Sequence, residues 1–439
     1  MVKPIFLAPK YLDGEKLSYR YIINKFKARK AMNGLPTNTL GEIARDISDG
    51  TRAKRDYIPN GVKIIGPTDI KNGIIYFHKL KSISRRGLQE KDFIREGDIL
   101  VSGVGRAGQV TIVPGELDGY AISNDVIKIR LKNKMQGPQV AAFLAGPLGQ
   151  LQLESIKTGT INRIRVQDLS NIMVPRDIKN QNQSYEPLPD QARAYKLYQD
   201  CLQLFAQMVP NIPSTNRLRK NWFVNPKLLK ADRLDPGYYH YYISGLKELV
   251  TKNYGSVKWV RLGEVVEIKR AIKPDLSPDQ TVKYFQLSDI DAELSIIQLC
   301  SEGKFGQLSN RIRYIVGEGD LVTEKAGSAT GTRGHITAVV TEKYAGMLAT
   351  DAFFNLEPRK IDPYYLLFLF KQPVVLRQIE MFARGLYNKM VLAGDFARLK
   401  IPRLGLQAEQ KIADNMREYV NTFEVIAGPG RWQSAGKDL

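Results

Sequence analysis

The chain has 439 residues and carries 65 Lys and Arg against 45 Asp and Glu, a formal net charge of +20. This length suits two or three domains. So large a positive excess indicates a polyanionic partner, either a nucleic acid or an anionic membrane surface. Two isolated cysteines and three scattered histidines argue against a disulfide framework and a metal centre, so we expect no metal and no cofactor in this chain.

The first residues precede no long apolar run, and no stretch approaches the roughly 20 apolar residues of a membrane helix. We therefore expect neither a signal peptide nor a membrane anchor, and a cytoplasmic location.

In the first half of the chain, β-branched segments bounded by Gly, Asp and Asn predict short strands. They are residues 62–65, 98–101, 109–113 and 126–129. A helix is predicted over residues 140–154. Farther on, apolar residues recur every three or four positions between Leu188 and Val209, which predicts an amphipathic helix ended by Pro210 and Pro213.

The second half predicts the same series of elements. Strands are expected over residues 320–323, 335–340 and 353–356, a helix over 363–382, and an amphipathic helix from Ile412 to Ile426. Each half is therefore α+β. The apolar stripe of each amphipathic helix could pack on its own domain, or the two helices could pack on each other or on a partner as a short coiled coil. The repetition favours the second arrangement.

Short motifs recur in the same order in both halves. Leu40-Gly41-Glu42 recurs as Leu262-Gly263-Glu264, an offset of 222 residues, and the Glu-Gly-Asp segment at residues 96–98 recurs at 318–320 with the same offset. Further matches are Thr68-Asp69-Ile70 with Ser288-Asp289-Ile290, Asn124-Asp125 with Thr350-Asp351, residues 159–164 with 385–390, and Val174-Pro175 with Ile401-Pro402. This collinear set predicts a duplicated domain.

One tempting motif is better explained by a turn. Residues 103–108 fit G-x-G-x-x-G, but the segment that follows, residues 109–113, is a predicted strand. A dinucleotide-binding fold needs a helix there, to hold the pyrophosphate at its N-terminus. We therefore expect a glycine hairpin between two strands, repeated at residues 327–334.

Signatures of catalysis are missing from the sequence. It has no P-loop and no Asn-Pro-Pro-aromatic loop of the kind that amino-methyltransferases carry. Glu267-Ile268-Lys269 has the form of a nuclease motif, but the matching residues of the first half do not. We therefore expect that this chain is not itself an enzyme.

Basic residues near predicted turns are the candidate DNA contacts, because Lys and Arg bind phosphates and arginine also reads guanine. Those of the first half are Arg52, Lys54, Arg55, Arg85, Arg86, Arg106, Arg163 and Arg165. Those of the second half are Lys269, Arg270, Lys273, Arg311, Arg313, Arg333, Arg384 and Lys389. Arg106 and Arg333 stand out because each lies in a glycine hairpin, where the backbone can approach a groove closely.

This order of motifs resembles the target recognition domains of type I restriction–modification DNA specificity subunits. As in that family, the duplication covers nearly the whole chain. The family also carries a similar Pro-Leu-x-x-x-Gln segment at the start of each spacer helix, and Gln191 and Gln410 stand at the matching places here.

The resemblance implies two tandem recognition domains related by a pseudo-twofold duplication and separated by amphipathic spacer helices. The boundaries we expect are 1–186 and 232–404 for the recognition domains, 187–231 for the central spacer helix and linker, and 405–439 for the C-terminal helix and tail. Each domain would read half of a bipartite site in double-stranded DNA. The helices would set the spacing and dock DNA methyltransferase subunits, with a restriction ATPase–nuclease as a further partner.

In that family S-adenosylmethionine, ATP and Mg²⁺ belong to the partner chains, as does all catalysis. The spacer helices here, about 20 residues each, are shorter than is usual for the family, so the chain could serve a related defence system. Two alternatives remain open: a stand-alone DNA-binding scaffold, and a nuclease or methyltransferase with an unrecognised active site. An RNA-binding role is disfavoured, since no aromatic-plus-basic RNA signature is found.

Overall fold

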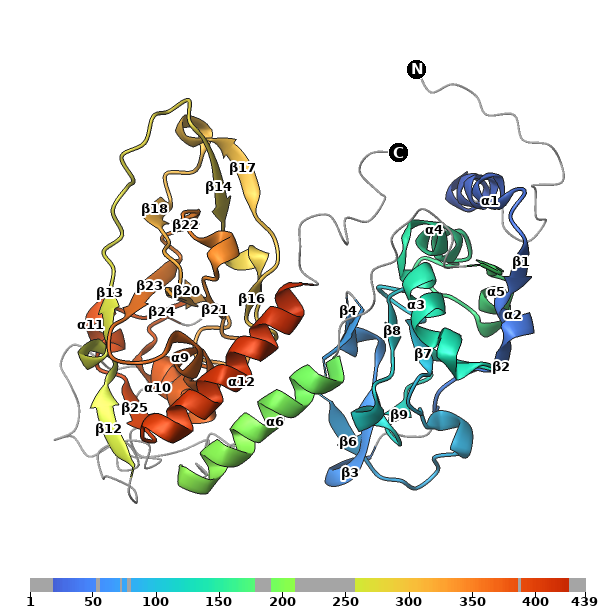
Figure 1. Ribbon diagram of the computed structural model, residues 1–439, viewed down its shortest axis with the longest axis horizontal. Coiled ribbons are helices and arrows are strands. Elements are labelled where there is room, and N and C mark those ends of the chain that lie inside the picture. The colour runs from blue at the N-terminus through green and yellow to red at the C-terminus, as the bar shows by residue number, and fades with distance from the viewer. Residues whose placement is uncertain are drawn as a thin grey trace. The chain divides into compact units, whose positions relative to one another are not determined.

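The computed structural model describes residues 19–52, 56–71, 73–76, 80–177, 191–209, 257–385 and 388–425. The chain divides into two compact units, the first ending at Ala192 and the second beginning at Arg193 (Figure 1). Both units mix helices with short strands, so the expected α+β class is confirmed for each of them. Within the described ranges, no helix combines the length and the apolar character needed to cross a membrane.

Unit 1 is built on a four-stranded antiparallel sheet in the order β2-β10-β7-β8 and a three-stranded sheet in the order β6-β3-β9. Its strands are β1 (Thr37–Thr39), β2 (Ala44–Asp49), β3 (Tyr57–Ile65), β4 (Ile70–Lys71), β5 (Ile74–Ile75), β6 (Lys81–Ile83), β7 (Ile99–Ser102), β8 (Val110–Ile112), β9 (Ala121–Ile122), β10 (Val126–Leu131) and β11 (Met173–Pro175). Strand β1 pairs with β11, and β4 pairs with β5 as a hairpin.

The helices of unit 1 are α1 (Tyr19–Met32), α2 (Leu40–Ile43), α3 (Gly137–Ala145), α4 (Pro147–Ser155) and α5 (Val166–Ser170). Residues of α3 and α4 form one hydrophobic core with β7 and β10, including the fully buried Val101, Ile129 and Phe143. The prediction of one helix over residues 140–154 is wrong. The helix breaks at Gly146, whose backbone is extended (φ −75°, ψ 172°) because the following Pro147 disfavours a helical conformation before it.

Unit 2 contains a four-stranded antiparallel sheet in the order β13-β23-β19-β21 and a second sheet in the order β17-β14-β22-β18. Its strands are β12 (Lys258–Arg261), β13 (Val266–Ile268), β14 (Thr281–Phe285), β15 (Ile290–Asp291), β16 (Ile296–Ile297), β17 (Ser301–Lys304), β18 (Ile312–Ile315), β19 (Leu321–Glu324), β20 (Ala326–Gly327), β21 (Thr337–Val339), β22 (Leu348–Thr350), β23 (Phe353–Pro358), β24 (Lys389–Met390) and β25 (Lys400–Arg403). As in unit 1, the first and last of the principal strands pair with each other, β12 with β25.

The helices of unit 2 are α6 (Gln191–Met208, from its third residue on), α9 (Pro363–Leu369), α10 (Pro373–Phe382), α11 (Ala393–Phe396) and α12 (Leu406–Glu424). The expected single helix over residues 363–382 is again two helices. Gln372 is extended (ψ 138°) ahead of Pro373, for the same steric reason as in unit 1.

Backbone pairing gives the residue equivalence between the units. Ser102 pairs with Val126 in unit 1 as Glu324 pairs with Phe353 in unit 2, so the offset is 222 residues in β7 and 227 in β10. The five additional residues lie in the glycine hairpin of unit 2, between β19 and β21.

This register corrects two of the sequence matches. Asn124-Asp125 is equivalent to Asp351-Ala352 rather than to Thr350-Asp351, since Gly103 N–H donates to the Asp125 carbonyl (2.7 Å) as Lys325 N–H donates to that of Ala352 (2.9 Å). The match of residues 159–164 with 385–390 also slips by one residue, because the loop of unit 2 is one residue longer.

The recurring Leu-Gly-Glu and Glu-Gly-Asp motifs have structural causes. Leu40 and Leu262 are fully buried, and each donates its N–H to the segment before the last strand of its unit (2.9 and 2.7 Å). In the second motif the buried Asp98 accepts from Arg95 N–H, and Asp320 accepts from Gly317 N–H, each at 2.8 Å. These bonds close a tight turn whose glycine has a positive φ, 84° at Gly97 and 78° at Gly319.

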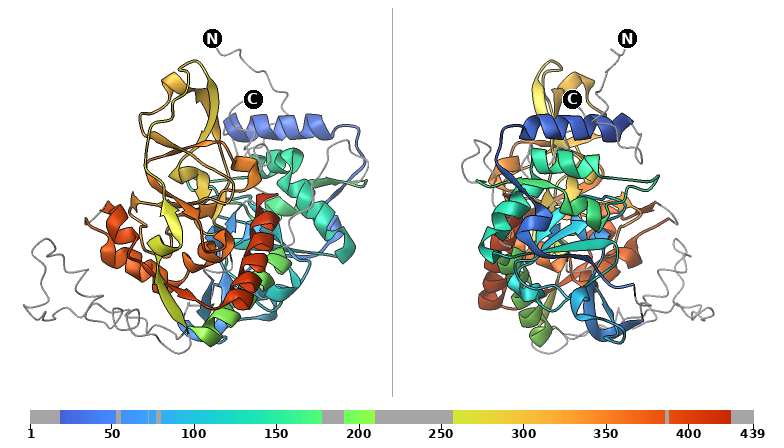
Figure 2. Two further views of the ribbon diagram at one scale, coloured as in Figure 1. Left: turned by 60° about the vertical axis from the view of Figure 1, so that its left-hand side comes forward. Right: turned by 90° about the vertical axis from the view of Figure 1, so that its right-hand side faces the viewer.

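Helices α6 and α12 lie side by side in Figure 1 and in the left view of Figure 2. Tyr198 stacks near Tyr419 with 5.7 Å between ring centroids, and the Cys201 thiol donates to the Ile412 carbonyl. Tyr198 precedes Cys201 along α6, whereas Tyr419 follows Ile412 along α12. The two helices are therefore antiparallel. They have 18 and 19 residues, near the expected length, and Pro210 and Pro213 lie outside the described residues.

The first residue of α6 is anchored within unit 1. Gln191 is almost fully buried, and its side chain accepts from Ile75 N–H (2.8 Å) and donates to the Gly73 carbonyl (2.5 Å), so it closes the β4–β5 hairpin. The expected counterpart, Gln410, does not do this. It is exposed on α12 and donates to Asp414, whereas the buried residue there is Glu409, which pairs with Arg403.

Candidate nucleic-acid interface

The predicted glycine hairpin of unit 1 connects β7 to β8. The Ser102 hydroxyl donates to the Arg106 carbonyl (2.7 Å) and accepts from Gln109 N–H (2.9 Å), which closes the turn. Gly105 and Gly108 have φ of 74° and 91°, values that favour glycine. A strand follows the G-x-G-x-x-G sequence, so the predicted glycine hairpin is confirmed, and Arg106 is exposed in the turn.

A second loop, residues 158–163, is bound to this hairpin by peptide groups. Thr158 and Arg163 close the loop with a pair of backbone hydrogen bonds, each 2.9 Å long. Ile164 N–H donates to the Gly103 carbonyl (2.9 Å), and Gly105 N–H donates to that of Asn162 (3.2 Å). Because Gly103 also bonds to Asp125, three segments distant in sequence form one surface.

A groove of about 880 Å³ opens over this surface, and hairpin, loop and the end of β2 all line it. Three predicted DNA contacts come together here: Arg52, Arg163 and Arg165. All three are exposed. Arg52 pairs with Asp49 (3.0 Å), and Arg163 pairs with Asp125 (3.2 Å). The groove therefore presents guanidinium groups to solvent, and the exposed Ile161 of the loop also lines it.

Unit 2 builds its loop surface with the same backbone bonds. Ala326 and Gly327 pair with Met390 and Lys389 as strands β20 and β24, and Val391 N–H donates to the Lys325 carbonyl (3.0 Å). Arg384 closes the loop with Met390 as Thr158 does with Arg163. Both units thus form this surface with equivalent backbone hydrogen bonds but with different side chains.

The longer hairpin of unit 2 is held by a buried acid and a buried imidazole. Glu324, at the position of Ser102, accepts from the Thr330 hydroxyl (2.9 Å) and from Ile336 N–H (3.2 Å). His335 contacts Thr323 at 2.9 Å and accepts from Gly331 N–H. Complete burial lowers the pKa of His335 to about 3, and burial raises the pKa of Glu324, so the imidazole is neutral and the pair serves the shape of the hairpin.

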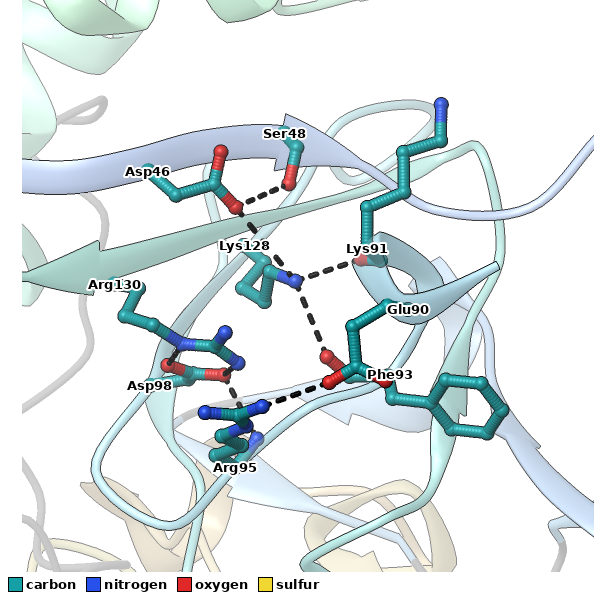
Figure 3. Close-up of polar contacts among 9 residues, drawn as sticks. All are labelled: Asp46, Ser48, Glu90, Lys91, Phe93, Arg95, Asp98, Lys128 and Arg130. Carbon is teal, nitrogen blue, oxygen red and sulfur yellow. Dashed lines mark hydrogen bonds and ion pairs between the residues drawn. The ribbon is translucent and has the colours of Figure 1, made fainter. Parts of the chain in front are cut away.

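Some of the basic residues neutralise buried aspartates. In unit 1, Arg130 of β10 forms two hydrogen bonds to Asp98, at 2.7 and 2.8 Å (Figure 3). In unit 2 the position of Arg130 is held by Glu357, and the cation is instead Lys269, which follows β13 and reaches Asp320 at 2.8 Å. Burial disfavours this ammonium, but the hydrogen bond and charge of Asp320 outweigh it and raise the pKa of Lys269.

Figure 3 also shows Lys128 of unit 1, a lysine that is fully buried. Lys128 donates to the carbonyls of Lys91 (2.6 Å) and Phe93 (3.1 Å) and lies 3.7 Å from Asp46. Burial lowers the pKa of this ammonium. Its equivalent in unit 2 is Asn355, which donates to Asp320 (3.0 Å). This interior network positions β10 beneath the groove.

The other predicted contacts are distributed as follows. In unit 1, Arg85 lies over the Phe93 ring, Arg86 is exposed, and Lys54 and Arg55 lie outside the described residues. In unit 2, Arg270, Arg333 and Lys273 are exposed, and Lys273 lies beside Phe305. Arg313 is half-buried. The other three form ion pairs: Arg311 with Asp351, Arg384 with Asp395 and Lys389 with Glu380.

Sequence reasoning missed three participants: Asp125, Ile161 and Glu324. Asp125 and Ile161 each lay in a recurring segment, but no signal in the sequence joined Asp125 to Arg163, 38 residues away, and Glu324 carried none. Among the described residues no group of His, Cys, Asp and Glu side chains is arranged to hold a metal ion.

A scan against known protein families finds no match for the chain, and no curated protein matches its sequence. Among solved structures it is similar to the HsdS subunit from Thermoanaerobacter tengcongensis, with 16% identity over 90% of this chain and 91% of that chain and a TM-score of 0.29. It is also similar to the type I restriction–modification S subunit from M. genitalium, with 13% identity over 90% and 92% and a TM-score of 0.34. The type IIG restriction endonuclease BpuSI is similar over 38% of this chain and 28% of its own, at 10% identity and a TM-score of 0.31.

Proposed function

We propose that the chain is the DNA specificity subunit of a type I-like restriction–modification complex. One observation carries the proposal: both units form the same surface from a glycine hairpin and a second loop joined by peptide hydrogen bonds. Two such surfaces in one chain suit a bipartite site, with each unit reading one half. The motif order and the net charge of +20 support the same function.

The physical basis is a division between positioning and reading. Exposed arginines and lysines around each hairpin bind phosphates and supply most of the affinity, which falls as salt rises. Side chains of the loops reach base edges and supply sequence preference. Glycines in the hairpin let the backbone come close to the duplex, as at Gly105, where an added Cβ would meet nothing within 4 Å.

We propose further that the units are copies of one recognition domain, bounded as the sequence indicates, and that α6 and α12 are the spacer helices. Each helix spans about 27–29 Å at 1.5 Å per residue. Their mutual packing is supported by the Tyr198–Tyr419 and Cys201–Ile412 contacts. Methyltransferase subunits, with S-adenosylmethionine, would dock on this part of the chain, and an ATP- and Mg²⁺-dependent restriction subunit would join through them.

The test is affinity purification of the tagged chain from its native host, followed by selection of bound sequences from random duplex DNA. The proposal expects a co-purifying methyltransferase and an enriched motif with two separated halves. Sequence-selective binding without any partner would favour the stand-alone scaffold instead. Methylation or cleavage of DNA by the pure chain, supplied with S-adenosylmethionine and Mg²⁺, would overturn the non-catalytic assignment.

A further inference from the structure

The two loop surfaces differ at one matched pair of positions. Arg163 pairs with the backbone of Val104 in unit 1, and Met390 pairs with Ala326 in unit 2, so Met390 occupies the place of Arg163. Asp125, which holds Arg163, is replaced by Ala352. Both members of the ion pair are therefore absent together from the second unit.

The backbone around this pair is the same in both units. The bond from Gly103 to Asp125 has its counterpart from Lys325 to Ala352, and the bond from Ile164 to Gly103 has its counterpart from Val391 to Lys325, all between 2.7 and 3.0 Å. The ion pair is consequently not needed to form the surface. Because the same backbone bonds form without this pair in unit 2, Arg163 is available for a role outside the fold.

Arg163 is placed to use its remaining donors. One amino group donates to Asp125 Oδ1 at 3.2 Å, while 56% of the side chain stays exposed in the groove. A guanidinium has five N–H donors in a fixed plane, so one anchored group leaves others available. Anchoring also removes rotamer freedom that binding would otherwise have to remove.

We propose that Arg163 reads a guanine in the half-site bound by unit 1, and that Asp125 is its positioning residue. Arginine donating to guanine O6 and N7 is the commonest specific contact in the major groove. Met390, 41% exposed, offers the matching base pair in the other half-site only an apolar contact, of the kind a thymine methyl group accepts. The two half-sites are thus unlike in sequence, an inference that rests on the proposed DNA-reading function.

The experiment compares motifs selected from random duplex DNA by the tagged chain, with whatever subunits co-purify, in four variants. Arg163→Met copies the residue of unit 2, Asp125→Ala removes the positioning carboxylate, and Asp125→Asn keeps an acceptor. Arg95→Met is the matched control. Arg95 is another ion-paired arginine of unit 1 with a side chain 58% exposed, but it does not line the groove.

We expect Arg163→Met to lower the preference for guanine at one position of one half-site by roughly 10- to 100-fold, leaving the other half unchanged. Asp125→Ala should weaken the same preference for guanine, but the affinity for random DNA should stay the same or rise, because a negative charge is lost. Asp125→Asn should keep part of the preference that Asp125→Ala loses. An unchanged motif in Arg163→Met, or the same loss in Arg95→Met, would overturn the inference. Absence of any motif with the unaltered chain would instead overturn the proposed function.

Discussion

Units 1 and 2 share the strand order of their four-stranded antiparallel sheets but neutralise equivalent buried aspartates in different ways. Asp98 pairs with Arg130 of β10, whereas Asp320 pairs with Lys269, the residue that follows β13. Where unit 1 has Arg130, unit 2 has Glu357, which also lies 3.4 Å from Lys269. The fold therefore requires a cation beside this aspartate but does not fix the segment that supplies it.

The two glycine hairpins likewise use different side chains for the same structural role. A serine hydroxyl closes the short hairpin of unit 1, and the longer hairpin of unit 2 needs a glutamate that reaches farther. In each case the backbone path is kept and the side chains that hold it are exchanged. Four experiments test how far the two units differ.

The largest effect is expected at the buried ion pairs. Arg130→Met leaves Asp98, 3% exposed, charged and unpaired, and should lower the stability of unit 1 by about 3–5 kcal/mol. Lys269→Met should lower that of unit 2 by less, about 2 kcal/mol, because Asn355 still donates to Asp320. Hydrogen exchange of the β7 and β19 amides measures both. Equal losses in the two units would show that Asn355 gives no compensation.

The next largest effect on stability distinguishes Gln191 from Gln410, the two glutamines expected near the start of the spacer helices. Gln191→Leu leaves Ile75 N–H buried without its partner and should destabilise the β4–β5 hairpin by about 1–3 kcal/mol, while the Gly73 carbonyl keeps the hydrogen bond from the Thr111 hydroxyl (2.8 Å). Gln410→Leu changes an exposed side chain and should alter stability by less than about 0.5 kcal/mol. Hydrogen exchange at residues 73–76 reports the first effect, and thermal unfolding reports the second. A comparable loss in Gln410→Leu would contradict the structural difference between them.

Acidification should loosen the hairpin of unit 2 selectively. The pKa of His335 is about 3 in the folded chain and near 6.5 when exposed, so between these values the unfolded chain binds the extra proton. The stability is complete above pH 6.5 and is lost as the pH falls, by about 1–2 kcal/mol at pH 5. The raised pKa of Glu324 acts in the opposite direction and reduces the net loss.

The measurement is amide exchange in β19 and β21 at pH 7 and pH 5, corrected for intrinsic rates, with β7 and β8 as the internal reference. The unit 1 hairpin, residues 103–109, has no histidine. His335→Gln should remove the loss of stability on acidification and leave only the opposite contribution of Glu324. An equal response of both hairpins to pH would rule out the imidazole as its source.

The smallest effect is expected at Arg163. Its pairing with Asp125 is largely exposed, so Arg163→Met should change the stability of unit 1 by no more than about 0.5 kcal/mol. A chemical denaturation midpoint close to that of the unaltered chain would confirm that the pair does not support the fold. A loss of 2 kcal/mol would mean that any change of DNA preference in this variant has a structural cause.

Much of the fold could be predicted from sequence because its signals are local. β-branched runs bounded by turn residues gave the strands β7, β8 and β10, and the glycine pattern followed by a strand gave the hairpin. Helix breaks at Pro147 and Pro373 were missed because the apolar periodicity continues across them. Asn124-Asp125 was matched one residue away from its true equivalent, because a match of two residues can be shifted by one position. Strand pairing allows only one alignment.

The candidate site was less predictable, since its members meet only in three dimensions. A list of basic residues could not separate Arg163, exposed in a groove, from Lys269, which neutralises a buried aspartate. Nor does composition reveal that Glu324 and His335 are interior groups. Whether a charge faces solvent or the core depends on strand partners 50 or more residues away, as for Lys269 and Asp320.

The loop at residues 158–163 is attached to the glycine hairpin by main-chain groups, and residues 160–162 expose their side chains. Gly159 has a positive φ of 82°, a value that favours glycine, but substitutions at the other three positions can accumulate without loss of the scaffold, because peptide groups hold the loop in place. A lineage carrying this chain could acquire new target sequences one residue at a time, and a laboratory library confined to Thr160, Ile161 and Asn162 would explore the same variation without disturbing assembly.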